Sequence, residues 1–405
     1  LCTIEKSMGE KDTQSPVKKP GVSLTRLQIA GWVAALVVIG GVIGVFGYKA
    51  VVTRTNTAAA TSEQFREIRS ILESSFNGDL NDEKQAEGAL RGYVASLGDP
   101  YTVYLNASEA EELSNDLAGQ LSGIGVEVGL KNDRLTVIAP IDETPAAKAG
   151  IRAGDIIATI DGQSTSELSL DEAVKKIRGE KGTEVKLTVV REGEEPKELA
   201  ITRDQIQVSS VKYEVKDGGV GYIRVRRFGD DTDTAIRNAA ADLAKQGVTK
   251  IVLDLRDNPG GYLNSAVTVS SEFLADGVVV EERGRHMESK QLVANPGGNL
   301  TNAKLVILIN EGSASASEIT AGALKDNGRA ILVGEKTYGK GSVQEVKQLS
   351  NGAQLKVTVA GWFTPKGVNI SKEGIKPDIE VKLTPEDSNA GRDPQLEKAL
   401  EAVRQ

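Results

Sequence analysis

Three serines at alternate positions stand directly before a glutamate in the stretch "NEGSASASEITAG": Ser313, Ser315 and Ser317, followed by Glu318. The apolar run 304–310 leads into this stretch and a helix is expected to begin near Ser315, so the serines lie on a strand-turn-helix corner. A hydroxyl on such a corner, beside the free N–H groups of a helix N-terminus, is placed as in serine hydrolases. Ser315 and Glu318 also have the Ser-x-x-Glu spacing of a capping box, which would explain both residues structurally. Spacing leaves both interpretations open until a base is found.

Two residues are candidates for that base. His286, the single histidine, lies in the polar loop "ERGRHMESK", which is more typical of a solvated surface. Lys340 lies in "GEKTYGKGSVQ" between Gly339 and Gly341, whose missing side chains let the backbone turn tightly and approach another segment. Burial there would lower the pKa of the lysine and supply a neutral amine. Taken alone, the loop is better explained as an exposed lysine in a glycine turn.

A third segment, "DLRDNPGG" at 254–261, stands between a buried strand and the next helix. Structurally, Asn, Pro and Gly make a turn. Chemically, glycine N–H groups at the start of a helix are what an oxyanion hole requires, since they can point at a carbonyl oxygen as negative charge develops.

Composition excludes several classes of function. The formal net charge of −8 gives no basis for binding nucleic acid. A single cysteine, Cys2, excludes an internal disulfide and a cluster of cysteine metal ligands, and a single histidine excludes a His-rich metal site. No metal is therefore expected.

An uncharged run of 20 residues, 29–48, is about the length that a helix needs to cross a hydrocarbon core of roughly 30 Å. Lys18, Lys19 and Arg26 precede it, which favours a cytoplasmic N-terminus, a single-pass anchor in the cell membrane and an extracytoplasmic remainder. A cleaved signal peptide is the alternative, because "TAAATS" at 57–62 offers small residues for cleavage. The apolar run exceeds the usual 7–15 residues of a signal peptide, so we expect the anchor to stay uncleaved.

Beyond the span, helical spacing gives way to short β-type runs and then to alternating strands and helices. The last pattern predicts an α/β core with a layered, largely parallel sheet. Asn351-Gly352, between two β-type runs, predicts a tight hairpin. The expected divisions are a cytoplasmic tail at 1–26, a transmembrane anchor at 27–49, a linker at 50–62, an N-terminal helical domain at 63–115, a small β-rich module at 116–205, the α/β core at 206–385 and a C-terminal helix at 386–405.

The three motifs "DLRDNPGG", "NEGSASASEITAGALKDNGRA" and "GEKTYGKGSVQ", in this order, resemble those of the carboxy-terminal processing peptidases, a family of tail-specific serine proteases. "LGDPYTVYL" resembles the N-terminal signature of the family, and "GIGVEV…TPAAKAGIRAGDIIATIDG" resembles its inserted PDZ domain. The likeness covers roughly residues 63–402. Three long motifs in the right order are far more specific than a single glycine-rich loop.

The resemblance implies a Ser-Lys dyad supported by a glutamine. Matched by motif, Ser315 is the nucleophile, Lys340 the general base and Gln344 the residue that orients the lysine. The oxyanion hole would use the N–H of Ala316 and one N–H from either Gly260 or Gly261. Glu318 would keep its capping role.

The PDZ resemblance implies recognition of an extended chain end, whose carboxylate is held by backbone N–H groups. The expected carboxylate loop is "GIGV", and three residues have the helical spacing to line an apolar pocket. For some of these residues, a role in the core of a small β domain is the alternative. The predicted peptide-binding residues are Gly123, Ile124, Gly125, Val126, Leu170, Val174 and Ile177.

The resulting hypothesis is a membrane-anchored serine endopeptidase that binds apolar C-terminal tails of proteins and cleaves through an acyl-enzyme, without a cofactor. Homo-oligomer formation is left open, as is whether the PDZ domain inhibits or activates. The alternative is a catalytically inert, membrane-tethered PDZ scaffold. A penicillin-recognising Ser-Lys enzyme is disfavoured, because residues 315–318 read Ser-Ala-Ser-Glu and lack the Ser-x-x-Lys spacing.

Overall fold

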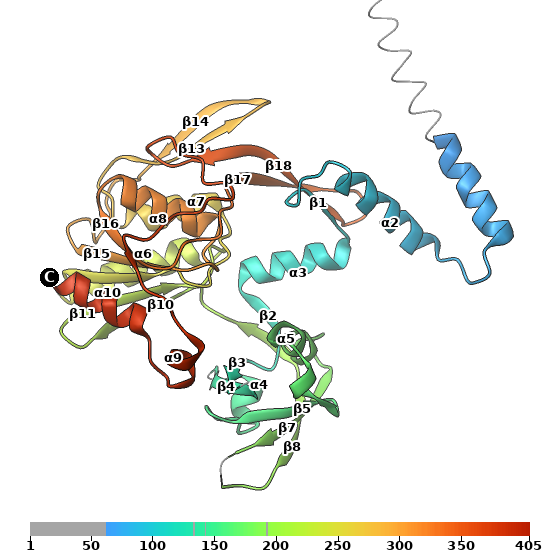
Figure 1. The fold of residues 1–405 in the computed structure, drawn as a ribbon, viewed down its shortest axis with the longest axis horizontal. Coiled ribbons are helices and arrows are strands. Elements are labelled where there is room, and N and C mark those ends of the chain that lie inside the picture. Colours follow the sequence, from blue (N-terminus) through green and yellow to red (C-terminus); the bar gives the residue numbers. More distant parts are fainter. Residues whose placement is uncertain (1–61, 133, 142, 192) are drawn as a thin grey trace, which may run out of the picture. The chain divides into compact units, whose positions relative to one another are not determined.

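The computed structural model describes residues 62–132, 134–141, 143–191 and 193–405 (Figure 1). The chain divides into two units at the bond between Lys84 and Gln85. The predicted membrane span at 29–48 lies outside the described residues. Within the described ranges, no helix combines the length and the apolar character needed to cross a bilayer.

The first unit is helical where it is described. Residues 62–75 form one helix, and α2 (Asp82–Ala95) begins in this unit. The side chains of Phe65, Ile68 and Ile71 are each more than half exposed. The apolar spacing that predicts a helix here therefore does not correspond to a buried face.

The β-rich module is a six-stranded antiparallel sheet with pairing order β3-β4-β5-β7-β8 and β6 on β5. Val185, Leu187 and Val189 alternate along β7 and point into the core, as the period of a half-buried strand requires. The strands are β3 (Val126–Lys131), β4 (Arg134–Pro140), β5 (Ile156–Ile160), β6 (Gln163–Ser164), β7 (Glu184–Val190) and β8 (Lys197–Thr202). The helical segments are α4 (Pro145–Lys148), η1 (Thr165–Glu167) and α5 (Leu170–Ile177).

Two paired strands join this module to the rest of the second unit. β2 (Gln120–Gly123), which follows α3 (Ala107–Ala118), pairs antiparallel with β9 (Asp204–Gln207). The chain therefore enters and leaves the module through adjacent strands, so the module is held at both ends.

The central sheet of the α/β core has the strand order β10-β11-β12-β15-β16-β19, and only β10 runs antiparallel to its neighbour within this sheet. The predicted, largely parallel sheet is confirmed. Its strands are β10 (Val211–Lys216), β11 (Val220–Val225), β12 (Lys250–Asp254), β15 (Lys304–Ile309), β16 (Ala330–Gly334) and β19 (Ile379–Glu380). The helices of the core are α6 (Thr232–Lys245), α7 (Leu263–Ser271), α8 (Ala316–Asp326), α9 (Pro385–Asn389) and α10 (Pro394–Arg404).

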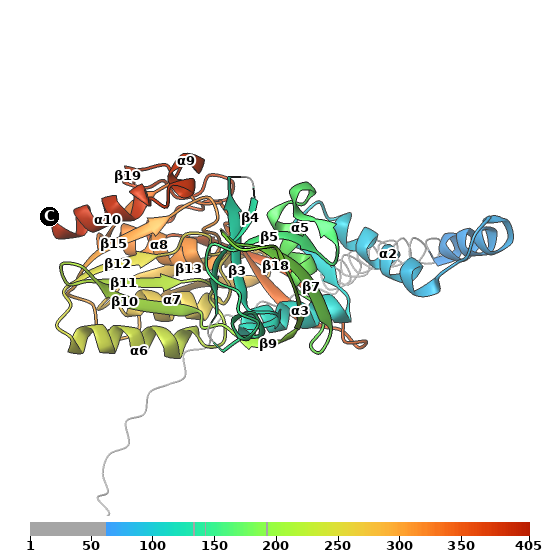
Figure 2. The same ribbon diagram turned by 90° about the horizontal axis from the view of Figure 1, so that it is seen from below.

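Helices cover both faces of this sheet, and Figure 2 shows α6 and α10 on opposite sides of the strands. Along β15, Leu305 and Ile307 belong to the cluster that includes residues of α6, α7 and α8. Val306 and Leu308 belong to a second cluster with Ala399 and other residues of α10. Burial on both faces explains why the central strands are almost continuously apolar.

A second, antiparallel sheet was not predicted. It has the order β1-β18-β13-β14, with β17 also on β18. Alternating strands and helices predict a single parallel sheet, but this pattern cannot show which strands pair in a separate sheet instead. The predicted hairpin at Asn351-Gly352 is present between β17 and β18, with residues 349–353 as its connection. The strands are β1 (Val103–Leu105), β13 (Val278–Gly284), β14 (Met287–Val293), β17 (Ser342–Gln348) and β18 (Gln354–Phe363).

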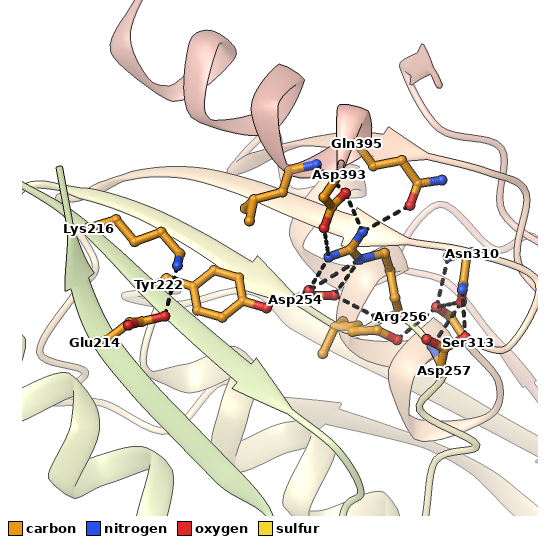
Figure 3. Close-up of polar contacts among 12 residues, drawn as sticks. Glu214, Lys216, Tyr222, Asp254, Arg256, Asp257, Asn310, Ser313, Asp393 and Gln395 are labelled. Carbon is orange, nitrogen blue, oxygen red and sulfur yellow. Dashed lines mark hydrogen bonds and ion pairs between the residues drawn. The ribbon is translucent and has the colours of Figure 1, made fainter. Parts of the chain in front are cut away.

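A buried ionic network fixes the loop after β12 to α10 (Figure 3). The Arg256 guanidinium donates to Asp254, at 2.7 Å, and to Asp393, at 2.9 Å. Asp254 also accepts from the Tyr222 hydroxyl at 2.7 Å, and its side chain is only 1% exposed. Such a pair is tightly coupled to folding, because removing one partner leaves the other charge buried and uncompensated.

Arg256→Ala should therefore lower the free energy of unfolding of the core by about 3–5 kcal/mol, because Asp254 loses its counter-ion. Arg392→Ala is the matched control: it breaks an Arg-Asp pair with Asp387 in which the arginine side chain is 59% exposed, and it should cost less than about 1 kcal/mol. Urea unfolding followed by the fluorescence of buried Trp362 measures both. Equal losses in the two variants would contradict this account.

Candidate active site

Ser315 occupies the corner between β15 and α8 with φ 53° and ψ −114°. This conformation is rare for a residue other than glycine and costs of order 1–3 kcal/mol. The two neighbouring serines are fully buried, and their hydroxyls donate to backbone carbonyls: Ser313 to Leu255 at 2.8 Å and Ser317 to Asn258 at 2.9 Å. Ser313 and Ser317 thus hold the corner in place, and Ser315 between them is the partly exposed serine of the three.

The loop 254–261 supports the serine corner from the side. Asn310 and Asp257 exchange two hydrogen bonds: the Asn310 amide donates to the Asp257 carboxylate at 2.7 Å, and the Asp257 N–H donates to the Asn310 side chain at 2.9 Å. The Ala314 N–H donates to the Asn258 carbonyl at 3.0 Å. Two of the three sequence motifs are therefore in direct contact.

The structure distinguishes the two glycines proposed for the oxyanion hole. The Gly260 N–H already donates to the Asn258 side chain at 2.9 Å. The Gly261 N–H makes no hydrogen bond within the described part of the chain, which makes Gly261 the better candidate donor. A Cβ on Gly260 would lie 2.9 Å from the Ala316 nitrogen, so only glycine allows this approach to the start of α8.

Lys340 lies in the same cavity as Ser315 and is largely buried. Within the described residues its ammonium has no hydrogen bond or ion pair, and it lies over the Tyr101 ring, 5.3 Å from Nζ to the centroid. Its pKa is lowered to about 8, chiefly by burial and then by the Lys356 ammonium, while Glu318 and Asp99 act in the opposite direction. A lysine with this pKa is neutral in about a tenth of molecules at pH 7, far more than an exposed lysine.

Glu318 connects the serine corner to the lysine loop. Its carboxylate is fully buried and accepts four hydrogen bonds. Oε2 accepts from the N–H groups of Ser315, at 2.9 Å, and Lys340, at 3.0 Å. Oε1 accepts from the Thr337 hydroxyl at 2.6 Å and the Gly339 N–H at 2.7 Å. Glu318 therefore has the predicted bond to the helix start and three more that the capping pattern does not predict.

Gln344 lines the same cavity, but its amide points elsewhere. Nε2 donates to the Ser342 hydroxyl at 2.8 Å and to the Thr358 hydroxyl at 3.3 Å. No hydrogen bond joins Gln344 to Lys340 among the described residues. The role of Gln344 in orienting the lysine stays a prediction.

The cavity has a volume of about 610 Å³, and it brings together all six residues predicted for the dyad, its supporting glutamine and the oxyanion hole. These are Ser315, Lys340, Gln344, Gly260, Gly261 and Ala316. His286 is not among the lining residues and faces another cavity. No group of side chains that could hold a metal ion is present in the described ranges.

Sequence patterns missed three residues that surround Lys340. Tyr101 stands under its ammonium, Lys356 raises the local positive potential, and the Trp362 indole donates to the Lys340 carbonyl at 2.8 Å. Lys356 and Trp362 lie on β18, and the sequence of this run predicts only a strand. The lysine within this apolar β-type run, Lys356, was the one sign in the run that a charged residue is placed there for a reason other than packing.

Most of the predicted PDZ residues meet at a small cavity of about 100 Å³. Its lining includes all of Gly123–Val126 together with Val174 and Ile177. Ile124 is only 1% exposed and is mainly a core residue. Leu170 packs against the same core and is not among the lining residues, so its expected place in the pocket is not supported.

Comparison with known proteins agrees with this arrangement. Residues 219–381 match peptidase family S41, residues 136–191 match a PDZ domain, and residues 47–109 match the activating protease CtpB N-terminal domain.

Full-length relatives and a solved structure extend the likeness. The probable CtpA-like serine protease of Staphylococcus aureus (strain MRSA252) is 38% identical over 383 residues, which cover 93% of this chain and 77% of the relative. The carboxy-terminal-processing protease of Bartonella bacilliformis (strain ATCC 35685 / KC583 / Herrer 020/F12,63) is 39% identical over 359 residues, covering 85% and 82%. The solved structure of the photosystem II D1 C-terminal processing protease is 32% identical, with a TM-score of 0.50, and the match covers 84% of this chain and 90% of that one.

The rate at which acetic anhydride labels Lys340, followed by mass spectrometry as pH is varied, should show a midpoint near pH 8. Lys356→Gln should raise this midpoint, because removing a neighbouring positive charge favours the charged form of Lys340. Lys356→Arg keeps the charge and should keep the midpoint low. An unchanged midpoint in Lys356→Gln would show that the two ammonium groups do not interact.

Proposed function

Because the chain belongs to peptidase family S41 and is a carboxy-terminal-processing serine protease with a PDZ domain, we propose that Ser315 is its nucleophile and Lys340 its general base. The observation that carries this proposal is a cavity in which a strained serine lies with a largely buried lysine of lowered pKa. The family also favours an enzyme over the inert scaffold.

In the proposed reaction, the neutral Lys340 amine takes the proton of the Ser315 hydroxyl as the oxygen attacks a peptide carbonyl. The N–H groups of Ala316 and Gly261 stabilise the oxyanion. The ammonium returns its proton to the leaving amine. Lys340 then deprotonates a water molecule, which hydrolyses the acyl-enzyme and restores the serine. This sequence requires no cofactor.

The PDZ domain is proposed to bind the apolar C-terminal tail of a protein substrate. β3 is an edge strand of its sheet, so a chain end could add beside it as a further strand. The small apolar cavity between Gly123–Val126 and α5 would take a side chain of that tail. Leu121 and Arg178 line both this cavity and the catalytic cavity, which supports coupling between tail binding and catalysis.

Residues 29–48 are proposed to anchor the protein in the cell membrane, with the catalytic part outside the cytoplasm. The uncharged 20-residue run and the preceding lysines support this topology.

The function is tested by incubating the protein with an unfolded substrate that ends in apolar residues and identifying fragments by mass spectrometry. Ser315→Ala and Lys340→Arg should each lower kcat/KM by roughly 10⁴-fold or more, since a guanidinium does not deprotonate. Wild-type kcat/KM should rise with pH through a midpoint near 8, because only the neutral amine of Lys340 accepts a proton. Amidating the substrate tail should slow cleavage by about tenfold or more if the PDZ domain holds the free carboxylate.

Lys336→Arg, an exposed lysine on the same loop, is the matched control and should retain activity. An active Lys340→Arg enzyme would rule out the proposed base. Equal cleavage of free and amidated tails would remove the proposed role of the PDZ domain while leaving the dyad intact.

The topology predicts that protease added to cells without their wall or outer membrane digests residues 63–405 and spares the segment before Ile29. Epitope tags at the two ends, detected by immunoblotting, distinguish the fragments. Protection of the C-terminal tag in cells stripped in this way, with the cell membrane still closed, would contradict an extracytoplasmic catalytic part.

A further inference from the structure

A second cavity, of about 810 Å³, lies beside the catalytic cavity. The two cavities share one wall, because both are lined by Tyr262, Leu263, Val343 and Gln344. A peptide chain that is cleaved at Ser315 therefore passes close to the second cavity.

Acidic side chains dominate the lining of this second cavity, and His286 is the one basic side chain among the described lining residues. No lysine or arginine lines it, and four carboxylates do: Asp230, Asp233, Glu282 and Glu345. Of the four, Glu345 has a cation partner at its side chain, Lys347. The other three have no ion pair among the described residues, so unpaired acidic groups outnumber basic groups on the cavity wall.

Glu282, on β13, is the most informative of the four. Its residue is 8% exposed, and its carboxyl has no hydrogen bond or ion pair in the described structure. Burial raises its pKa, and Lys290 on the adjacent strand β14 counteracts this only in part. Burying a carboxyl without a partner is unfavourable, which is the situation that a bound cation would correct.

Asp233, in the first turn of α6, gives an independent second observation. One oxygen accepts from the Thr268 hydroxyl at 3.0 Å. The other oxygen, Oδ1, is buried without any hydrogen-bond partner. Two carboxylates from different elements, β13 and α6, thus have unused acceptor capacity around one cavity.

We propose that this cavity is a specificity pocket for a lysine or arginine side chain of the substrate, a few residues from the scissile bond. Its volume accommodates such a side chain, and an ammonium or guanidinium supplies the several donors that the carboxylates lack. A metal ion is the less suitable occupant, since no set of ligands for one is present in the described residues. The inference rests on the proposed function, because it assigns a subsite to the same protease.

The first test begins with the digest of an unfolded protein, in which cleavage sites mapped by mass spectrometry identify the position enriched in basic residues. Two peptides are then compared that differ only at this position, where one has lysine and the other its uncharged isostere norleucine. With the full chain in detergent, kcat/KM should be at least about tenfold higher for the lysine peptide. Glu282→Gln and Asp233→Asn should each remove most of this preference and leave kcat/KM for the norleucine peptide within about twofold.

Glu281→Gln is the matched control on the same strand. The Glu281 carboxylate is not part of the cavity lining, and it already accepts hydrogen bonds from Arg283 and from Ser289. This variant should retain the full preference for lysine. Kinetics with the norleucine peptide also report folding, since a misfolded variant loses activity toward both peptides. If Glu282→Gln misfolds in this way, Glu282→Asp is measured in its place. Glu282→Asp keeps the negative charge, so it should keep the preference for lysine.

Binding to the Ser315→Ala chain, measured by fluorescence anisotropy of the same two peptides, tests the pocket without catalysis. Tighter binding of the lysine peptide that is lost in Ser315→Ala/Glu282→Gln supports the proposal. Equal binding and equal cleavage of both peptides by the wild type overturn it. Absence of any cleavage by the wild type, with the binding preference intact, would instead overturn the proposed function.

Discussion

A single buried carboxylate, that of Glu318, holds both reactive loops of the active site. It accepts from the backbone N–H of the serine and from three groups in the loop that carries the lysine. Hydrogen bonds to an ionised carboxylate are stronger and shorter than neutral ones, so the distance between the two loops has little freedom. Because the serine backbone is strained, some such restraint is required to keep it from relaxing.

The same carboxylate also shows how structural and catalytic needs are reconciled. A negative charge near Lys340 raises the pKa of this residue, which opposes a neutral amine. Burial and the second ammonium, on Lys356, act against that effect. Lys356 thus offsets the effect of Glu318 on the Lys340 pKa, although Lys356 makes no described hydrogen bond itself. The positioning of the loop and the lowered pKa are obtained together, because they come from groups on different elements.

Much of this could be predicted from the sequence, and what could not has identifiable causes. The order of strands and helices predicted the central sheet, because its strands are buried on both faces and read as apolar runs. The antiparallel sheet was missed, because pairing between distant strands such as β13 and β18 leaves no local pattern. Motif order predicted that Ser315, Lys340 and one of Gly260 and Gly261 belong together. Which glycine has a free N–H depends on the Asn258 rotamer, which spacing does not determine.

The two cavities separate charges that would otherwise neutralise one another. Lys340 and Lys356 lie in one cavity, while Glu282 and Asp233 lie in the other, and none of the four has an ion pair with a described residue. Direct pairing of either lysine with either carboxylate would raise the pKa of the lysine and occupy the carboxylate. The wall that both cavities share includes the apolar side chains of Leu263 and Val343, which keep the two groups apart. The charges that shift the Lys340 pKa are Lys356, Glu318 and Asp99, all outside the acidic cavity. A substrate cation held by Glu282 could therefore contribute to binding with little effect on the pKa of Lys340.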